Sequence, residues 1–280
     1  PGWYDPPCAD GCRGAGLTVM LCVAVGGVSF LLTRRAVVPS ASAASAISMP
    51  AQSIADPTVS SAENTAAPAN ALGLTADEAR AMLADPLMVL VNHTSKMPDD
   101  YTFDTKECGS ATAVNKTLQT VACVAFLEMQ KAAAADGVTV WMQSGYRSVK
   151  YQTSLYERKT KYYLDKGYDN ATAKEKAAAV VNPPGYSEHN CGLAADLNSP
   201  EHTGLDEGFE KTAAFRWLCE HAGDYGFILR YPKDAEDKTE IIYEPWHWRY
   251  VGVENAAKIN ASGLCFEEYI ETLQSIAAEG

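Results

Sequence analysis

Residues 187–196 read SEHNCGLAAD, and residues 244–249 read EPWHWR. The first stretch places an imidazole, His189, seven residues before a carboxylate, Asp196, and the second adds His247. Two imidazoles and one carboxylate are a ligand set that catalytic zinc uses, with a fourth position left for water. Gly192 gives the backbone freedom to bend between the first two side chains. We therefore take His189, Asp196 and His247 as candidate ligands of one zinc ion.

Glu244 is the candidate general base of this site. It lies three residues before His247, close enough to take a proton from a water molecule beside the metal. Each of these residues also has an ordinary interpretation, because single histidines are more often structural, Asp196 is suited to capping a turn, and Glu244 to an exposed surface. Taken one by one, these ordinary interpretations would stand, but the residues occur in two stretches that also match the family pattern described next, and this match favours the metal site.

A third motif precedes both stretches. Residues 144–148 read SGYRS, and Gln152 follows Arg147 by five residues. In this order the three motifs resemble the D-alanyl-D-alanine carboxypeptidase family of zinc peptidases, which includes the vancomycin-resistance D,D-carboxypeptidases. The resemblance extends over about residues 87–252 and implies the fold of that family, a small antiparallel sheet flanked by helices and shared with the hedgehog signalling domain.

The resemblance also implies roles for individual residues. The family's zinc ligands correspond to His189, Asp196 and His247, and its catalytic base corresponds to Glu244. Its substrate-orienting arginine corresponds to Arg147, whose guanidinium is suited to holding a terminal carboxylate bidentately. The remaining matches, both to positions near the substrate, are Gln152 and Ser187. Cys191 stands where the resemblance leads us to expect a small polar residue such as threonine.

The activity implied is removal of the terminal D-alanine from peptidoglycan stem peptides. Two alternatives remain open at this point: an L,D-carboxypeptidase acting on tetrapeptide stems, and a zinc-binding module without catalysis on the same fold. The presence of both Glu244 and Arg147 argues against the second, because a purely structural site needs neither.

The amino-terminal part of the chain differs in composition from the rest. Residues 16–33 are uncharged and mostly apolar, near the lower limit of about 17–25 residues for a membrane span. Residues 1–35 are therefore expected to be a membrane anchor or a signal peptide, the latter cleaved near residues 41–46. Residues 36–71 are rich in Ala, Ser and Pro and are expected to be a linker. Residues 72–280 are expected to form one catalytic domain.

The location implied by the substrate is the bacterial cell surface, with the catalytic domain outside the membrane. Arg34 and Arg35 follow the apolar run, whereas only Arg13 precedes it, and this charge bias favours the opposite orientation. We give more weight to the chemistry of the site. The net charge of −12 argues against nucleic acid as a partner. None of the eight cysteines forms a C-x-x-C pair, so a thiolate zinc site is not indicated, but some disulfides are expected outside the membrane.

Hydrophobic periodicity predicts an α+β fold. The strands are short and not separated by regular helices, which disfavours a doubly wound sheet. Thr75–Glu78 is a capping box, which predicts a helix that ends before Pro86. Further helices are expected over residues 111–135, 148–165, 170–181, 209–222 and 265–276, and strands over residues 88–91, 138–142, 227–231 and 240–243.

Overall fold

A four-stranded antiparallel sheet of order β3-β4-β6-β5 carries the predicted motifs. Its strands are β3 (Trp141–Ser144), β4 (Ala194–Asn198), β5 (Phe227–Leu229) and β6 (His247–Tyr250). The computed structural model describes residues 70–109 and 116–279. Within these residues the elements form a mixed fold with small antiparallel sheets, so the predicted α+β class is confirmed. The predicted anchor or signal, and nearly all of the predicted linker, lie outside the described residues.

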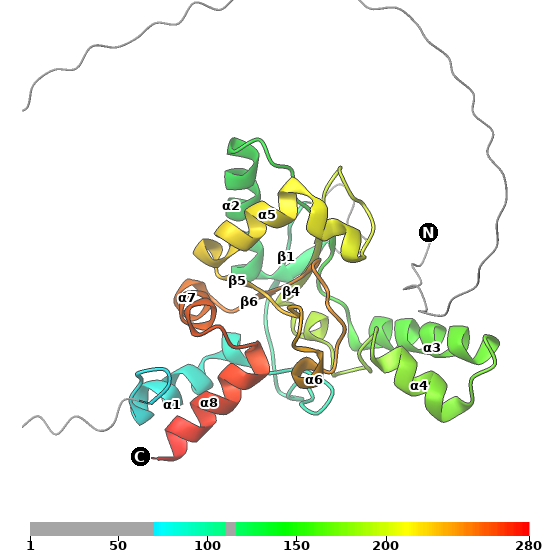
Figure 1. Cartoon of the computed structure of the whole chain (residues 1–280), viewed down its shortest axis with the longest axis horizontal. Helices are drawn as coiled ribbons and strands as arrows, with labels where there is room; N and C mark the ends of the chain where they lie inside the picture. The colour runs from blue at the N-terminus through cyan, green and yellow to red at the C-terminus, as the bar shows by residue number, and fades with distance from the viewer. Residues whose placement is uncertain (1–69, 110–115, 280) are drawn as a thin grey trace, which may run out of the picture. The chain divides into compact units, whose positions relative to one another are not determined.

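One face of the sheet is covered by α2 (Thr120–Ala135) and α5 (Ala213–His221), seen in Figure 1. Side chains alternate between the two faces of a strand. Ala195 and Leu197 of β4 and Trp248 of β6 therefore point into a hydrophobic core with these helices. Their neighbours in the sequence, Asp196 and His247, point to the opposite face. The sheet thus separates an apolar core from the face that carries the polar motifs.

The remaining helices form two pairs. α1 (Ala76–Ala84) packs on α8 (Phe266–Ala278), and α3 (Val149–Asp165) lies beside α4 (Asn170–Ala178), as Figure 1 shows. The first pair joins α7 (Val253–Ser262) in a second hydrophobic cluster. The capping box of Thr75 and Glu78 is present at the start of α1. No helix within the described residues is long and apolar enough to span a membrane.

The structure corrects two predicted strands. Residues 88–91 form no strand. Met88 ends a 3-10 helix, Pro86–Met88, and the carbonyl groups of Leu87 and Val89 accept hydrogen bonds from the guanidinium of Arg249 instead of a neighbouring strand. Residues 240–243 form none either: α6 (Glu236–Thr239) ends at Thr239, and its C-cap residue Glu240 has a left-handed φ of 57°.

Other boundaries also differ from those predicted. The helix expected over residues 111–135 begins at Thr120, because the residues before it form β2 (Thr117–Gln119), which pairs with β1 (Thr105–Glu107). The helix expected over residues 209–222 begins at Ala213, where the hydroxyl of Thr212 caps it. Residues 110–115 lie outside the described part. The pair β1 and β2, the strands β4 and β6, and helix α7 were not predicted.

The five cysteines that the structure describes are free thiols, so the expected disulfides are absent from this part of the chain. Cys191 is fully buried, and its thiol donates a hydrogen bond to the carbonyl of Glu188 at 2.9 Å. The thiol thus makes a bond of the kind that the hydroxyl expected at this position would make.

Candidate active site

Strand pairing brings two of the predicted zinc ligands together. Asp196 of β4 and His247 of β6 are direct partners in the antiparallel register, and Ser144 of β3 is the partner of Asp196 on its other side. A register shift between Met142 and Ser144 marks a bulge at this end of β3. Bulges redirect side chains at a strand end. This bulge lies at the end of β3, three residues before Arg147.

The third predicted ligand comes from the turn before β4. His189 lies in a short 3-10 helix, Glu188–Cys191, that ends at Gly192 with a left-handed φ of 69°. A Cβ atom at residue 192 would lie 3.0 Å from the ring of Phe103 and 3.1 Å from the backbone nitrogen of Gln119. Gly192 therefore satisfies both the backbone angle and the close packing that turn His189 toward β4.

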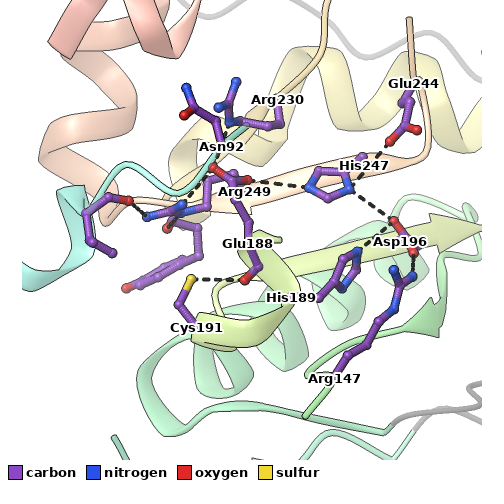
Figure 2. A network of polar contacts seen from close by, with 12 residues as sticks. Asn92, Arg147, Glu188, His189, Cys191, Asp196, Arg230, Glu244, His247 and Arg249 are labelled. Carbon is purple, nitrogen blue, oxygen red and sulfur yellow. Dashed lines mark hydrogen bonds and ion pairs between the residues drawn. The ribbon is translucent and has the colours of Figure 1, made fainter. Parts of the chain in front are cut away.

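The three side chains converge on one point, as Figure 2 shows. Asp196 Oδ1 lies 3.3 Å from His189 Nε2 and 3.2 Å from His247 Nδ1. One ligand atom from each residue lies within 4.8 Å of the others, and all three residues are buried. His189 donates its Nδ1 proton to the carbonyl of Gly145 at 2.7 Å, which leaves the Nε2 lone pair facing Asp196. The donor types and their directions fit a zinc ion.

The electrostatics of the site favour a cation. Burial lowers the pKa of His247, but the carboxylates of Asp196, Glu188 and Glu244 outweigh burial and raise this pKa to about 9. Burial, with the charge of Arg147, lowers the pKa of His189 to about 4. The pKa of Asp196 lies well below its usual range, because His189 and Arg147 outweigh its burial. The carboxylates thus hold a proton on His247, at the place where a metal ion would supply positive charge.

Glu244 lies in the turn before β6 with its Oε2 atom 3.6 Å from His247 Nδ1. Its side chain is nearly buried, and this burial raises its pKa to about 8. It also lines the cavity described below. A carboxyl group beside the metal position, with a pKa near neutrality, has the placement and the proton affinity of a general base.

Arg147 follows β3 and contacts the same site. Its Nε donates to the hydroxyl of Ser144 at 3.0 Å, and its Nη2 is paired with Asp196 Oδ2. Its remaining nitrogen, Nη1, has no hydrogen-bond partner among the described residues. Arg147 therefore combines a fixed orientation with one nitrogen that is free to donate to a ligand.

Gln152 and Ser187, the other two predicted substrate contacts, are placed differently. Both are buried, and neither lines the cavity at the metal site. The amide of Gln152 donates to the carbonyl of Asn182 at 2.7 Å, and Asn182 does line the cavity. Contact of Gln152 and Ser187 with a substrate stays a prediction.

A cavity of about 730 Å³ adjoins the metal position. Beyond the catalytic candidates, its wall includes Tyr151 and Leu155 of α3, Val180 and Val181 after α4, and Trp246. Apart from Trp246, which belongs to the quoted stretch 244–249, sequence reasoning did not single out these residues, because apolar side chains at helical spacing are also what a protein core requires. The volume is in the range of cavities that bind small ligands.

A buried His-Asp-His set, with a carboxyl group and an arginine beside it at a cavity, is the arrangement of a zinc peptidase. Residues 115–253 match the VanY family, described as D-alanyl-D-alanine carboxypeptidase. A D-alanyl-D-alanine carboxypeptidase of Enterococcus faecalis is 37% identical over 187 residues, which are 66% of this chain and 66% of that protein. The chain thus spans just under two thirds of the length of this relative.

Two solved structures are also similar. A mutant of the vancomycin resistance D,D-pentapeptidase VanY, in complex with zinc(II), is 36% identical with a TM-score of 0.58, covering 66% of this chain and 99% of that one. The LD-carboxypeptidase LdcB is 33% identical with a TM-score of 0.57, covering 68% of this chain and 88% of that one. The chain belongs to the D-alanyl-D-alanine carboxypeptidase family, and the resemblance found in the sequence is confirmed.

Proposed function

We propose that this protein is a zinc-dependent D-alanyl-D-alanine carboxypeptidase that removes the terminal D-alanine from peptidoglycan stem peptides. The observation that carries the proposal is the convergence of His189, Asp196 and His247 beside Glu244 at a cavity. The names of the relatives support the reaction and the substrate class. The solved VanY structure that contains zinc(II) supports the choice of metal.

The proposed reaction assigns the activation of water and the proton transfers to the metal position and to Glu244. When bound, zinc polarises the scissile carbonyl group and acidifies the attacking water. Glu244, as a carboxylate, accepts the proton of that water and then passes it to the amine of the departing D-alanine. Its position 3.6 Å from His247 Nδ1 places its carboxyl group next to the proposed metal ligands, within reach of the water and of the departing amine. Burial of the site keeps bulk water from competing for the proton.

Arg147 is proposed to hold the free carboxylate at the end of the substrate. Ser144 and Asp196 fix the plane of its guanidinium, and Nη1 remains available to a ligand. A guanidinium held in this way makes directed hydrogen bonds to a carboxylate. This contact would limit cleavage to the last residue of a peptide, which separates a carboxypeptidase from an endopeptidase.

Mass spectrometry of defined muropeptides, after incubation with the zinc-loaded protein, tests the proposal. We expect pentapeptide stems ending in D-alanyl-D-alanine to lose one D-alanine while tetrapeptide stems stay intact. Cleavage of tetrapeptide stems in preference would instead identify an L,D-carboxypeptidase, a reaction that the likeness to LdcB keeps as the second candidate. Cleavage of neither stem by a protein with full zinc content would identify a binding module.

We further propose that the catalytic domain lies outside the cell membrane, attached through its amino-terminal segment or released after cleavage of a signal. The apolar run over residues 16–33 and the Ala/Ser/Pro-rich residues 36–71 support this location. Protease added to intact cells should degrade the domain. A domain that is protected until the cells are lysed would favour the orientation that Arg34 and Arg35 indicate.

A further inference from the structure

A glutamate that takes no part in the mechanism above is completely buried beside the metal site. Glu188 precedes the ligand His189, and its side chain has no solvent exposure. A buried carboxylate is costly unless its charge and its hydrogen bonds are satisfied. The two oxygens of Glu188 face different partners, as Figure 2 shows.

The Oε1 atom of Glu188 contacts two buried arginines. It accepts a hydrogen bond from Arg230 Nε at 2.8 Å and another from Arg249 Nη1 at 2.8 Å. Arg230 is also paired with Glu267 of α8, where Nη1 donates to Oε2 at 2.7 Å. Two arginines and two glutamates balance in charge. Both hydrogen bonds from the arginines go to Oε1, so Oε2 of Glu188 is not needed to hold this cluster together.

The Oε2 atom of Glu188 faces a zinc ligand instead. It lies 3.5 Å from Nε2 of His247, at the outer limit of a hydrogen bond, and neither atom has another hydrogen-bond partner among the described residues. The opposite ring atom, Nδ1, is the one that lies 3.2 Å from Asp196 Oδ1. A carboxylate only accepts hydrogen bonds, so it stabilises the ring proton on Nε2 and leaves the lone pair of Nδ1 to a metal.

We infer that Glu188 is a positioning residue of the metal site, which selects the Nε2–H tautomer of His247 so that Nδ1 binds zinc. The inference rests on the proposed zinc site. His189 provides the contrast, because the carbonyl of Gly145 holds its proton on Nδ1 and directs Nε2 to the metal. The two histidines therefore use opposite ring nitrogens, and each is oriented by a different acceptor. Such outer acceptors typically change metal affinity by about 10–100-fold when they are lost.

Two isosteric variants, Glu188→Gln and Glu267→Gln, distinguish the positioning of His247 from the charge balance of the buried cluster. In Glu188→Gln, we expect the amide oxygen to stay on the two arginines and the amide NH2 to face His247 Nε2. That group donates, so it favours a proton on Nδ1, the atom that the metal requires. Zinc affinity, measured by competition with a chelator, should fall by about 10–100-fold. Glu267→Gln removes a charge from the same cluster without touching His247, and its zinc affinity should stay within about threefold of wild type.

Nuclear magnetic resonance of the ring nitrogens gives a readout that needs no variant. In the zinc-loaded wild-type protein, we expect the ring proton of His247 on Nε2 and the metal on Nδ1. The reverse assignment would overturn the inference, even if Glu188→Gln failed to fold. Unchanged zinc affinity in Glu188→Gln would also overturn it, as would an equal loss in Glu267→Gln, which would indicate a structural role only. A wild-type protein that takes up no zinc would overturn the proposed function together with this inference.

Discussion

Amidating the terminal carboxylate of a pentapeptide substrate should lower kcat/KM by about 10- to 150-fold. This range follows from the unpaired nitrogen of Arg147: Nε and Nη2 are held by Ser144 and Asp196, and Nη1 has no hydrogen-bond partner in the part of the chain that the structure describes. One hydrogen bond to a charged group contributes roughly 1.5–3 kcal/mol, and about 1.4 kcal/mol corresponds to a tenfold change in rate. Release of the last residue from free and amidated peptides, followed by chromatography, measures the ratio.

The ratio of kcat/KM on free and amidated peptides also tests whether Arg147 binds the terminal carboxylate. Arg147→Lys should lower the rate on the free peptide, because an ammonium lacks the planar fork that Ser144 and Asp196 orient. The same change disturbs Asp196, but this disturbance affects both peptides and cancels in their ratio. We therefore expect the ratio to fall toward one in Arg147→Lys. Arg158→Lys, at an exposed arginine on α3, is the matched control and should keep the wild-type ratio. Equal cleavage of free and amidated peptides by the wild type would refute the contact.

Three further predictions concern the metal site. Glu244→Gln should keep zinc and fold but lose about 10²–10⁴-fold in kcat, because an amide does not accept the proton; activity within a few-fold of wild type would assign the base elsewhere. His189→Ala should lose zinc in metal analysis, and full zinc content would contradict its role as a ligand. The pKa of His247 is raised to about 9 without metal, so zinc must displace a proton at pH 7 and bind more tightly as the pH rises toward that value. Calorimetry in buffers of different ionisation enthalpy should detect this proton, and its absence would contradict the assignment.

The residues of the candidate site were identifiable from the sequence because they lie in short motifs whose order resembles that of one family, and because their chemistry suits a metal site. His189 and Asp196 lie within one short stretch, and Glu244 and His247 lie within another. The strands that bring the stretches together were not identifiable in the same way. β4 is buried along its whole length and reads AADLN, without the alternation that marks a half-exposed strand. β6 reads HWRY, where aromatic and polar side chains alternate but all except the last are buried.

The role of Glu188 depends on contacts that no local pattern contains. Its arginine partners lie 42 and 61 residues further along the chain. In the sequence, Glu188 stands between a serine and a histidine, and such a polar tripeptide is also what an ordinary exposed turn contains. Only the folded chain shows that this side chain is fully buried, and that within the described residues the polar neighbour of one of its oxygens is His247 alone.

The link between Arg230 and Glu267 carries the contacts that support the site past the end of the family match. The family match ends at residue 253, whereas Glu267 lies beyond it on α8. A fragment that ends with the match would leave Arg230 without one of its two carboxylate partners in the protein interior, and an uncompensated buried charge is strongly destabilising. The two helices that carry the chain past residue 253 therefore support the candidate site, and a version of this protein trimmed for study or engineering has to retain them.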